Sequence, residues 1–149
     1  MRVSAIVGAR TAGLVILRDL LEPVCDEYHV CTDDGSLGYH GFVTGRLQEL
    51  LAAGAGYTSC FAVGPMPMMR AVAEASSRWS LPALVSLDPL MIDGTGMCGG
   101  CRVTIGGETK FACVDGPFFP ATEIDFDEAA DRKSMYAEDE RVSCLMVRT

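Results

Sequence analysis

The stretch TSCFAVGPMPMMRAVAEASSRWSLPALVSL, residues 58–87, decides the fold class of this 149-residue chain. An apolar run ends at Gly64 and is followed by a segment with proline in its first turn and apolar residues at helical spacing. A second apolar run covers residues 83–87. Because a strand, a helix and a strand in this order form a parallel pair with a crossover, the stretch predicts an α/β fold.

The same alternation extends toward the N-terminus. Residues 3–8 and 27–32 predict two more strands, and residues 14–22 and 42–53 predict helices. Together these elements predict a partial doubly wound parallel sheet. Ligands of such sheets bind at the carboxyl ends of the strands, where residues 8–11, 32–36 and 64–67 form loops.

The pattern changes after Leu87. Residues 102–105 and 108–112 flank Gly106-Gly107, which predicts a β-hairpin. Residues 125–136 predict a helix that is capped by Asp125 or Asp127. We therefore expect three segments: an α/β domain over residues 1–87, a small subdomain over residues 88–136, and a frayed tail over residues 137–149.

The composition excludes several classes of function. The net charge is −8, and none of the 12 basic residues forms a run of three, so nucleic acid is not an expected partner. No apolar segment reaches the roughly 18–20 residues of a membrane span, and the N-terminus does not read as a secretory signal, so we expect a cytoplasmic protein. Seven cysteines without an export signal argue against a disulfide framework.

Three cysteines carry the clearest chemical signal, in the pattern Cys98-x2-Cys101-x11-Cys113. Plant-type [2Fe–2S] sites use C-x4-C-x2-C and a distant fourth cysteine. Asp93 stands where the first of these cysteines would be. The four glycines between Asp93 and Cys101 suit a loop that turns sharply around a cluster.

Three alternatives remain open at this point. The cysteines could be structural, or they could bind zinc, which needs a fourth ligand in a chain whose only histidines are His29 and His40. A cluster could also be completed by Cys60 or Cys144 while Asp93 stays unligated. The G-x-G-x-x-G match at residues 94–99 is not a dinucleotide fingerprint, because a hairpin rather than a helix follows it.

Four motifs resemble a known family: TDDGSLGYHGFVTG at 32–45, CFAVGPMPMM at 60–69, DGTGMCGGC at 93–101 and FACVDGP at 111–117. They are similar to electron-transfer subunits of the ferredoxin–NADP reductase superfamily. Within it they look like the small subunits of NADH-dependent reduced ferredoxin:NADP oxidoreductases, or sulfide dehydrogenases, which are related to the electron-transfer subunit of dihydroorotate dehydrogenase. The resemblance covers the chain up to about Tyr136.

The resemblance implies a metal centre and its ligands. A [2Fe–2S] cluster would be held by Asp93, Cys98, Cys101 and Cys113. In the dihydroorotate dehydrogenase subunit the first ligand is cysteine, so Asp93 points to the bifurcating type of small subunit. These residues would be ligands only, and no catalytic residue is expected in this chain.

The resemblance also implies that the sheet binds NAD(P)H. Gly64 and Pro65 would let the backbone approach the nicotinamide and the pyrophosphate, with Met66 beside them, although the methionines of this helix also suit core filling. In the loop that also contains the cofactor-binding candidate Gly35, Asp33 and Asp34 would accept hydrogen bonds from the ribose hydroxyls and favour NADH. The first βα loop would contribute two residues, Gly8 and Arg10, of which the arginine could instead bind a phosphate.

Relatives of this type carry FAD on a β-barrel domain, for which this sequence shows no motif. We therefore expect the chain to correspond to the C-terminal half of such a subunit and to be inactive alone. The whole would relay electrons between NAD(P)H, FAD and a larger flavin and iron–sulfur subunit, with ferredoxin as a further partner. The alternatives are a dihydroorotate dehydrogenase or hydrogenase electron-transfer subunit, or a zinc-stabilised interaction module.

Overall fold

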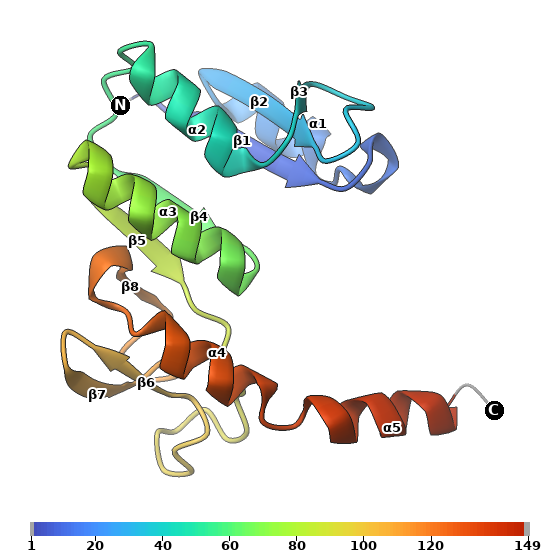
Figure 1. Cartoon of the computed structure of the whole chain (residues 1–149), viewed down its shortest axis with the longest axis vertical. Helices are drawn as coiled ribbons and strands as arrows, with labels where there is room; N and C mark the ends of the chain where they lie inside the picture. Colours follow the sequence, from blue (N-terminus) through green and yellow to red (C-terminus); the bar gives the residue numbers. More distant parts are fainter. Residues whose placement is uncertain (1, 148–149) are drawn as a thin grey trace. The chain divides into compact units, whose positions relative to one another are not determined.

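The computed structural model describes residues 2–147, and the chain divides between Tyr57 and Thr58 into two compact units (Figure 1). Each unit combines helices with a three-stranded sheet of its own, so the predicted α/β class is confirmed. The single doubly wound sheet remains a prediction. We describe the N-terminal unit and the C-terminal unit separately.

The N-terminal unit is built on a parallel sheet in the order β1-β2-β3. Its elements are β1 (Ser4–Ala9), η1 (Ala12–Leu14), α1 (Arg18–Leu21), η2 (Glu22–Val24), β2 (Glu27–Thr32), β3 (Tyr39–His40) and α2 (Val43–Ala52). Cys31 and Thr32 at the end of β2 are fully buried. The Thr32 hydroxyl donates to the Leu37 carbonyl at 2.8 Å and accepts from the Leu37 N–H at 3.0 Å. These two bonds hold the polar loop that follows β2.

The single helix expected over residues 14–22 is wrong. The structure has two 3-10 turns and one four-residue α-helix there. Leu17 adopts a left-handed backbone with φ 59°, which interrupts the helix. Leu14, Ile16 and Leu20 are exposed. Apolar spacing alone therefore does not make a helix here, because no packed surface receives the apolar side chains.

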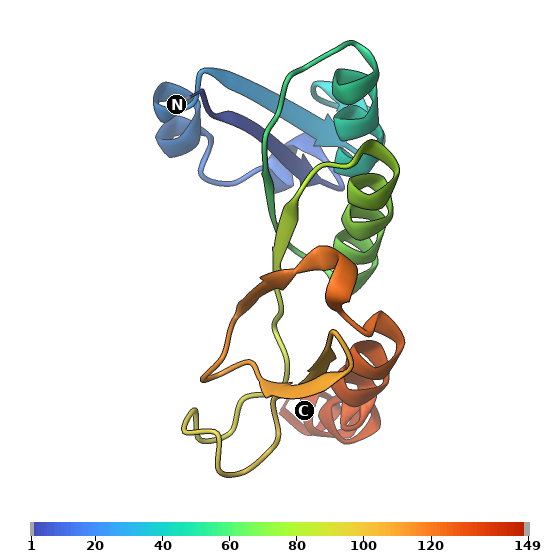
Figure 2. The same ribbon diagram turned by 90° about the vertical axis from the view of Figure 1, so that its left-hand side faces the viewer.

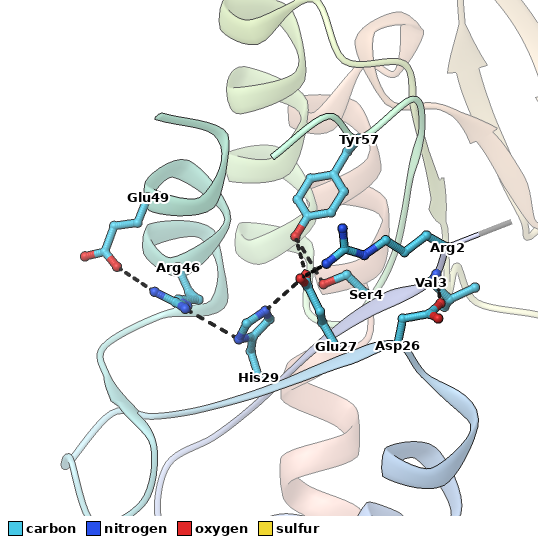
Figure 3. A network of polar contacts seen from close by, with 9 residues as sticks. All are labelled: Arg2, Val3, Ser4, Asp26, Glu27, His29, Arg46, Glu49 and Tyr57. Atoms are coloured by element: carbon cyan, nitrogen blue, oxygen red, sulfur yellow. Dashed lines mark hydrogen bonds and ion pairs between the residues drawn. The ribbon is translucent and has the colours of Figure 1, made fainter. Parts of the chain in front are cut away.

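A polar network lies toward the amino ends of β1 and β2 (Figure 3). The Tyr57 hydroxyl donates to Ser4 Oγ at 3.1 Å and to Glu27 Oε2 at 3.5 Å, and Arg2 pairs with the same carboxylate. His29 Nε2 lies 3.8 Å from Glu27 Oε2. The network joins both strands to the segment that ends the N-terminal unit. It lies at the opposite end of the strands from the predicted nucleotide loops.

The C-terminal unit contains a second sheet in the order β4-β5-β8, with β4 and β5 parallel and β8 antiparallel to β5. Its elements are β4 (Cys60–Val63), α3 (Met66–Trp79), β5 (Ala83–Ser86), β6 (Arg102–Ile105), β7 (Glu108–Phe111), β8 (Phe118–Pro120), η3 (Ala121–Glu123), α4 (Phe126–Ser134) and α5 (Ala137–Val147). The helix α3 packs along β4 and β5 (Figure 2). Met69 of α3 and Val85 of β5 are fully buried. Burying a side chain of this size stabilises the fold by about 1.5–3 kcal/mol.

Two further strands, β6 and β7, pair antiparallel, and Gly106 and Gly107 between them both have positive φ. α4 follows, and the Asp125 carboxylate caps it by accepting from the N–H groups of Asp127 and Glu128. Of the two expected caps, the structure therefore uses Asp125.

The frayed tail expected after Tyr136 is wrong for the described residues, because residues 137–147 form the helix α5. Its first turn carries three acidic side chains, which stabilise a helix N-terminus. The last two residues of the predicted tail, 148 and 149, lie outside the described residues. No helix within residues 2–147 has the length and apolar character needed to cross a membrane.

Candidate metal centre and nucleotide loops

The segment from Asp88 to Cys101, which we call the cysteine loop, connects β5 to β6. Gly96 has φ 82°, and a Cβ on it would lie 3.0 Å from Val114 Cγ2. A Cβ on Gly100 would lie 3.2 Å from Ile92 Cδ1 and 3.5 Å from Cys98 Sγ. At these two positions the backbone approaches its neighbours closely enough to favour glycine.

Asp93 stands near the middle of the cysteine loop and organises it. One carboxylate oxygen accepts from the Thr95 N–H at 2.8 Å, and the other accepts from the Cys98 N–H at 3.1 Å. The bond from Thr95, together with bonds from Cys98, lowers the pKa of Asp93 below its ordinary value. The carboxylate is therefore anionic and tied to the backbone of the first cysteine.

Cys101 and Cys113 bring their thiols together. Cys101 is 1% exposed and belongs to the main apolar core, and Cys113 packs against that core. The two Sγ atoms are 3.1 Å apart, and the Cys113 N–H donates to Cys101 Sγ at 3.5 Å. The hydrogen bond with Cys101, followed by burial, raises the pKa of the Cys113 thiol. Both cysteines are free thiols rather than a disulfide.

Cys98 differs from this pair because its side chain is exposed. Its Sγ accepts from the Gly100 N–H at 3.4 Å. The four predicted donors thus form two local pairs, Asp93 with Cys98 and Cys101 with Cys113. Among residues 2–147, no group of three or more histidine, cysteine, aspartate or glutamate side chains is close enough to hold one metal ion.

The two alternative thiols lie on other elements. Cys60 begins β4, where burial raises the pKa of its thiol, and Cys144 is exposed on α5. Neither belongs to a group of three donors within the part of the chain that the structure describes.

Two basic side chains of α4 contact the cysteine loop and were not predicted. Arg132 Nη2 donates to the Gly99 carbonyl at 3.1 Å and lies 3.5 Å from the Gly100 carbonyl. Lys133 Nζ pairs with Asp88 Oδ2 at 2.5 Å. No sequence signal could have found them, because basic residues in the last turn are ordinary in helices.

In the N-terminal unit, the loops after β1 and β2 meet as the parallel fold predicts. The Asp33 N–H donates to the Ala9 carbonyl at 3.1 Å, and the Asp34 N–H donates to the Arg10 carbonyl at 3.2 Å. The Asp34 carboxylate accepts from the hydroxyl and the N–H of Ser36, which lowers its pKa. Asp34 is therefore engaged within its own loop.

The two glycines of these loops have different constraints. Gly35 has φ 72°, as its turn requires. A Cβ on Gly8 would lie 2.5 Å from Val43 Cγ1 at the start of α2. Gly8 therefore lets α2 pack closely on β1.

In the C-terminal unit, Gly64 and Pro65 connect β4 to α3, with Pro65 as the helix N-cap. A Cβ on Gly64 would lie 2.8 Å from Met68 Cε. Met66, the first residue of α3, is partly buried and packs against the core. The structure thus places these three predicted residues at the carboxyl end of β4, in a different unit from the other five.

Comparisons with known proteins converge on one family. The family described as the iron–sulfur cluster binding domain of dihydroorotate dehydrogenase B matches residues 88–125. A Thermotoga maritima homologue of the dihydroorotate dehydrogenase B (NAD(+)) electron transfer subunit is 43% identical over 95% of this chain and 49% of its own length. A probable subunit of the same name from Methanocaldococcus jannaschii is 34% identical over 85% of this chain and 48% of its own length.

A solved structure gives the same answer at the level of the fold. It comes from work on flavin-based electron bifurcation by the NADH-dependent reduced ferredoxin–NADP oxidoreductase, and it aligns with a TM-score of 0.88 at 40% identity. The alignment covers 99% of this chain and 53% of that one. The chain spans about half the length of the relatives it matches. By sequence and by fold, the chain is therefore similar to about half of the electron transfer subunit of dihydroorotate dehydrogenase B and of a chain in the NADH-dependent reduced ferredoxin–NADP oxidoreductase structure.

Proposed function

We propose that this chain carries the [2Fe–2S] cluster and the NAD(P)H-binding segment of an electron-transfer subunit in a flavin-dependent oxidoreductase. One observation carries the proposal. Three thiols and one carboxylate occur at ferredoxin-like spacing within the segment that matches an iron–sulfur binding domain. Thiolates are the usual ligands of such clusters, and a carboxylate is a harder donor that can complete the set.

The geometry of the donors fits a cluster in part. Cys101 and Cys113 converge at 3.1 Å beside the apolar core, which gives two anchored ligands. Asp93 and Cys98 are joined through the backbone of the cysteine loop. Within residues 2–147, the four donors do not gather around a single metal ion. Once bound, a [2Fe–2S] cluster supplies one-electron storage and transfer.

Two loops, one in each unit, carry the residues that we expect to bind NAD(P)H. Asp33, whose side chain has no hydrogen bond within residues 2–147, would accept ribose hydroxyls, while Asp34 holds the shape of the loop. The N-terminus of the 14-residue helix α3 favours phosphate at Gly64 and Pro65. A carboxylate at the ribose would repel a 2′-phosphate, so we expect NADH to bind more tightly than NADPH unless Arg10 pairs with that phosphate.

The remaining parts of the electron path lie outside this chain. FAD would be held by the other half of the subunit, and electrons would pass to a larger flavin and iron–sulfur subunit, with ferredoxin as a further partner. The names of two relatives favour dihydroorotate dehydrogenase as the alternative partner. The subunit that co-purifies with the chain decides between these partners.

The test is the visible spectrum of anaerobically reconstituted protein, compared with a Cys98→Ala variant. A [2Fe–2S] protein is red-brown and becomes paramagnetic when it takes up one electron, whereas a zinc protein is colourless. We expect colour in the parent chain and its loss in the variant. A colourless parent that retains zinc would establish the interaction module instead.

A further inference from the structure

The helix α4 holds the cysteine loop at both of its ends. At the start of the loop, Asp88 pairs with Lys133 at 2.5 Å. At its end, Arg132 donates to the carbonyls of Gly99 and Gly100, which separate Cys98 from Cys101. Successive residues of one helix therefore fix both ends of the loop that carries the predicted ligands.

The Arg132 guanidinium is unusual because its charge is not neutralised by a contact. Its side chain is partly buried, and Nε is buried without a hydrogen-bond partner among residues 2–147. In the same range, no carboxylate comes within 4.0 Å of it, although Glu128, one helical turn earlier, also has a buried oxygen without a partner. Arg70, by comparison, pairs with Asp127 at 2.5 Å.

We propose that Arg132 is a positioning residue for the metal centre. It holds the Gly99 and Gly100 carbonyls by hydrogen bonds, a contact that we call the clamp, and its positive charge favours the reduced cluster. The inference rests on the proposed function. Arginine stays charged in proteins, and here a single nitrogen of its planar guanidinium, Nη2, reaches both carbonyls, whereas lysine carries a compact ammonium in place of this planar group. The clamp therefore fixes the backbone between two ligands and also places a cation beside them.

The sign of the electrostatic effect follows from charge balance. A cluster held by three thiolates and a carboxylate is anionic, and reduction adds one more electron to it. No bond at Arg132 forms or breaks in this step. A nearby cation stabilises the more negative state, and net charge and hydrogen bonding are known determinants of cluster potentials. Removal of the charge should therefore lower the reduction potential.

Two variants separate the clamp from the charge. Arg132→Gln removes the charge, and Arg132→Lys keeps the charge but replaces the planar guanidinium whose Nη2 contacts both carbonyls. Arg70→Gln is the matched control, because it removes an arginine that contacts α4 away from the cysteine loop. Each protein is titrated against redox dyes by visible absorption, and its iron content is followed during exposure to air.

At a fixed solution potential, we expect Arg132→Gln to lower the ratio of reduced to oxidised cluster about tenfold. For a one-electron couple this corresponds to a reduction potential that is lower by about 59 mV. Arg132→Lys should stay within about twofold of the parent ratio, since the charge remains. It should nevertheless lose iron several-fold faster in air. Arg70→Gln should match the parent in both measurements.

A readout on metal-free protein keeps the clamp testable when a variant holds no cluster. Chymotrypsin cleaves after Leu90 and the neighbouring methionine only where the cysteine loop is accessible. Both Arg132 variants should be cut there several-fold faster than Arg70→Gln. Unchanged cleavage together with an unchanged potential would overturn the inference, while a parent chain without iron or sulfide would overturn the proposed function itself.

Discussion

Cys98 and Cys101 are both predicted ligands, but only Cys101 is also expected to stabilise the fold. Alanine variants of the two residues should therefore distinguish loss of metal binding from loss of stability. Cys98 is exposed, whereas Cys101 is 1% exposed and belongs to the apolar core with Val103 and Ala112. Both variants should lose the cluster. Only Cys101→Ala should also destabilise the metal-free protein.

The magnitude follows from burial. Removing the Cys101 sulfur deletes one buried heavy atom, which costs about 0.8 kcal/mol of transfer free energy, and the small cavity that remains raises the total to about 1–2 kcal/mol. Cys113 also loses its hydrogen-bond partner. Removing the exposed Cys98 sulfur should change the free energy of unfolding by less than about 0.5 kcal/mol.

The chain provides a local probe for this measurement. Trp79 is the only tryptophan and ends α3, which packs in the same unit as Cys101. Urea unfolding followed by Trp79 fluorescence, with chelator and reductant present, should show a midpoint lower by about 0.5–1 M for Cys101→Ala alone. Equal midpoints would refute the core role of Cys101, and full iron retention by Cys98→Ala would refute its role as a ligand.

Three further predictions test other parts of the account. Asp93→Cys should retain iron with an altered visible spectrum, whereas Asp93→Ala should lose most of its iron, and an unchanged spectrum in the alanine variant would exclude Asp93 as a ligand. Asp33→Ala should weaken NADH binding to the assembled subunit about tenfold, as measured by calorimetry, since a hydrogen bond to a charged group contributes roughly 1.5 kcal/mol. Asp34→Ala should instead reduce the thermal stability of the N-terminal unit. Equal effects of the two variants on NADH binding and on stability would contradict their separate roles. Tyr57→Phe should destabilise the chain by about 1 kcal/mol in urea through loss of the bonds to Ser4 and Glu27, a result that an unchanged midpoint would contradict.

The strongly patterned parts of the fold could be predicted from sequence. Residues 58–87 encode β4, α3 and β5 because apolar runs, proline at the helix start and a 14-residue periodic segment all agree. The segment around Leu17 could not be predicted, because its helical spacing has no surface to pack against and the left-handed residue breaks it. β3 and β8 are two and three residues long, which is too short to give a periodic signal.

The candidate metal centre could likewise be predicted from the sequence only in part. Cysteine spacing pointed to Cys98, Cys101 and Cys113, and the resemblance to a family added Asp93 as the fourth predicted ligand; this ligand set remains a prediction. The contact of Arg132 with the Gly99 carbonyl could not be read from sequence, since it joins positions 33 residues apart through the packing of α4. Tertiary packing also decides that Cys101 is in the core while Cys98 is exposed.

The central claim is that the cysteine loop and Cys113 bind two irons. Iron and acid-labile sulfide should be determined in the chain purified and kept under anaerobic conditions, with zinc measured in the same sample. The account predicts about two irons and two sulfides per chain and no stoichiometric zinc. Protein that is folded but free of iron and sulfide, or that carries one zinc, would contradict it.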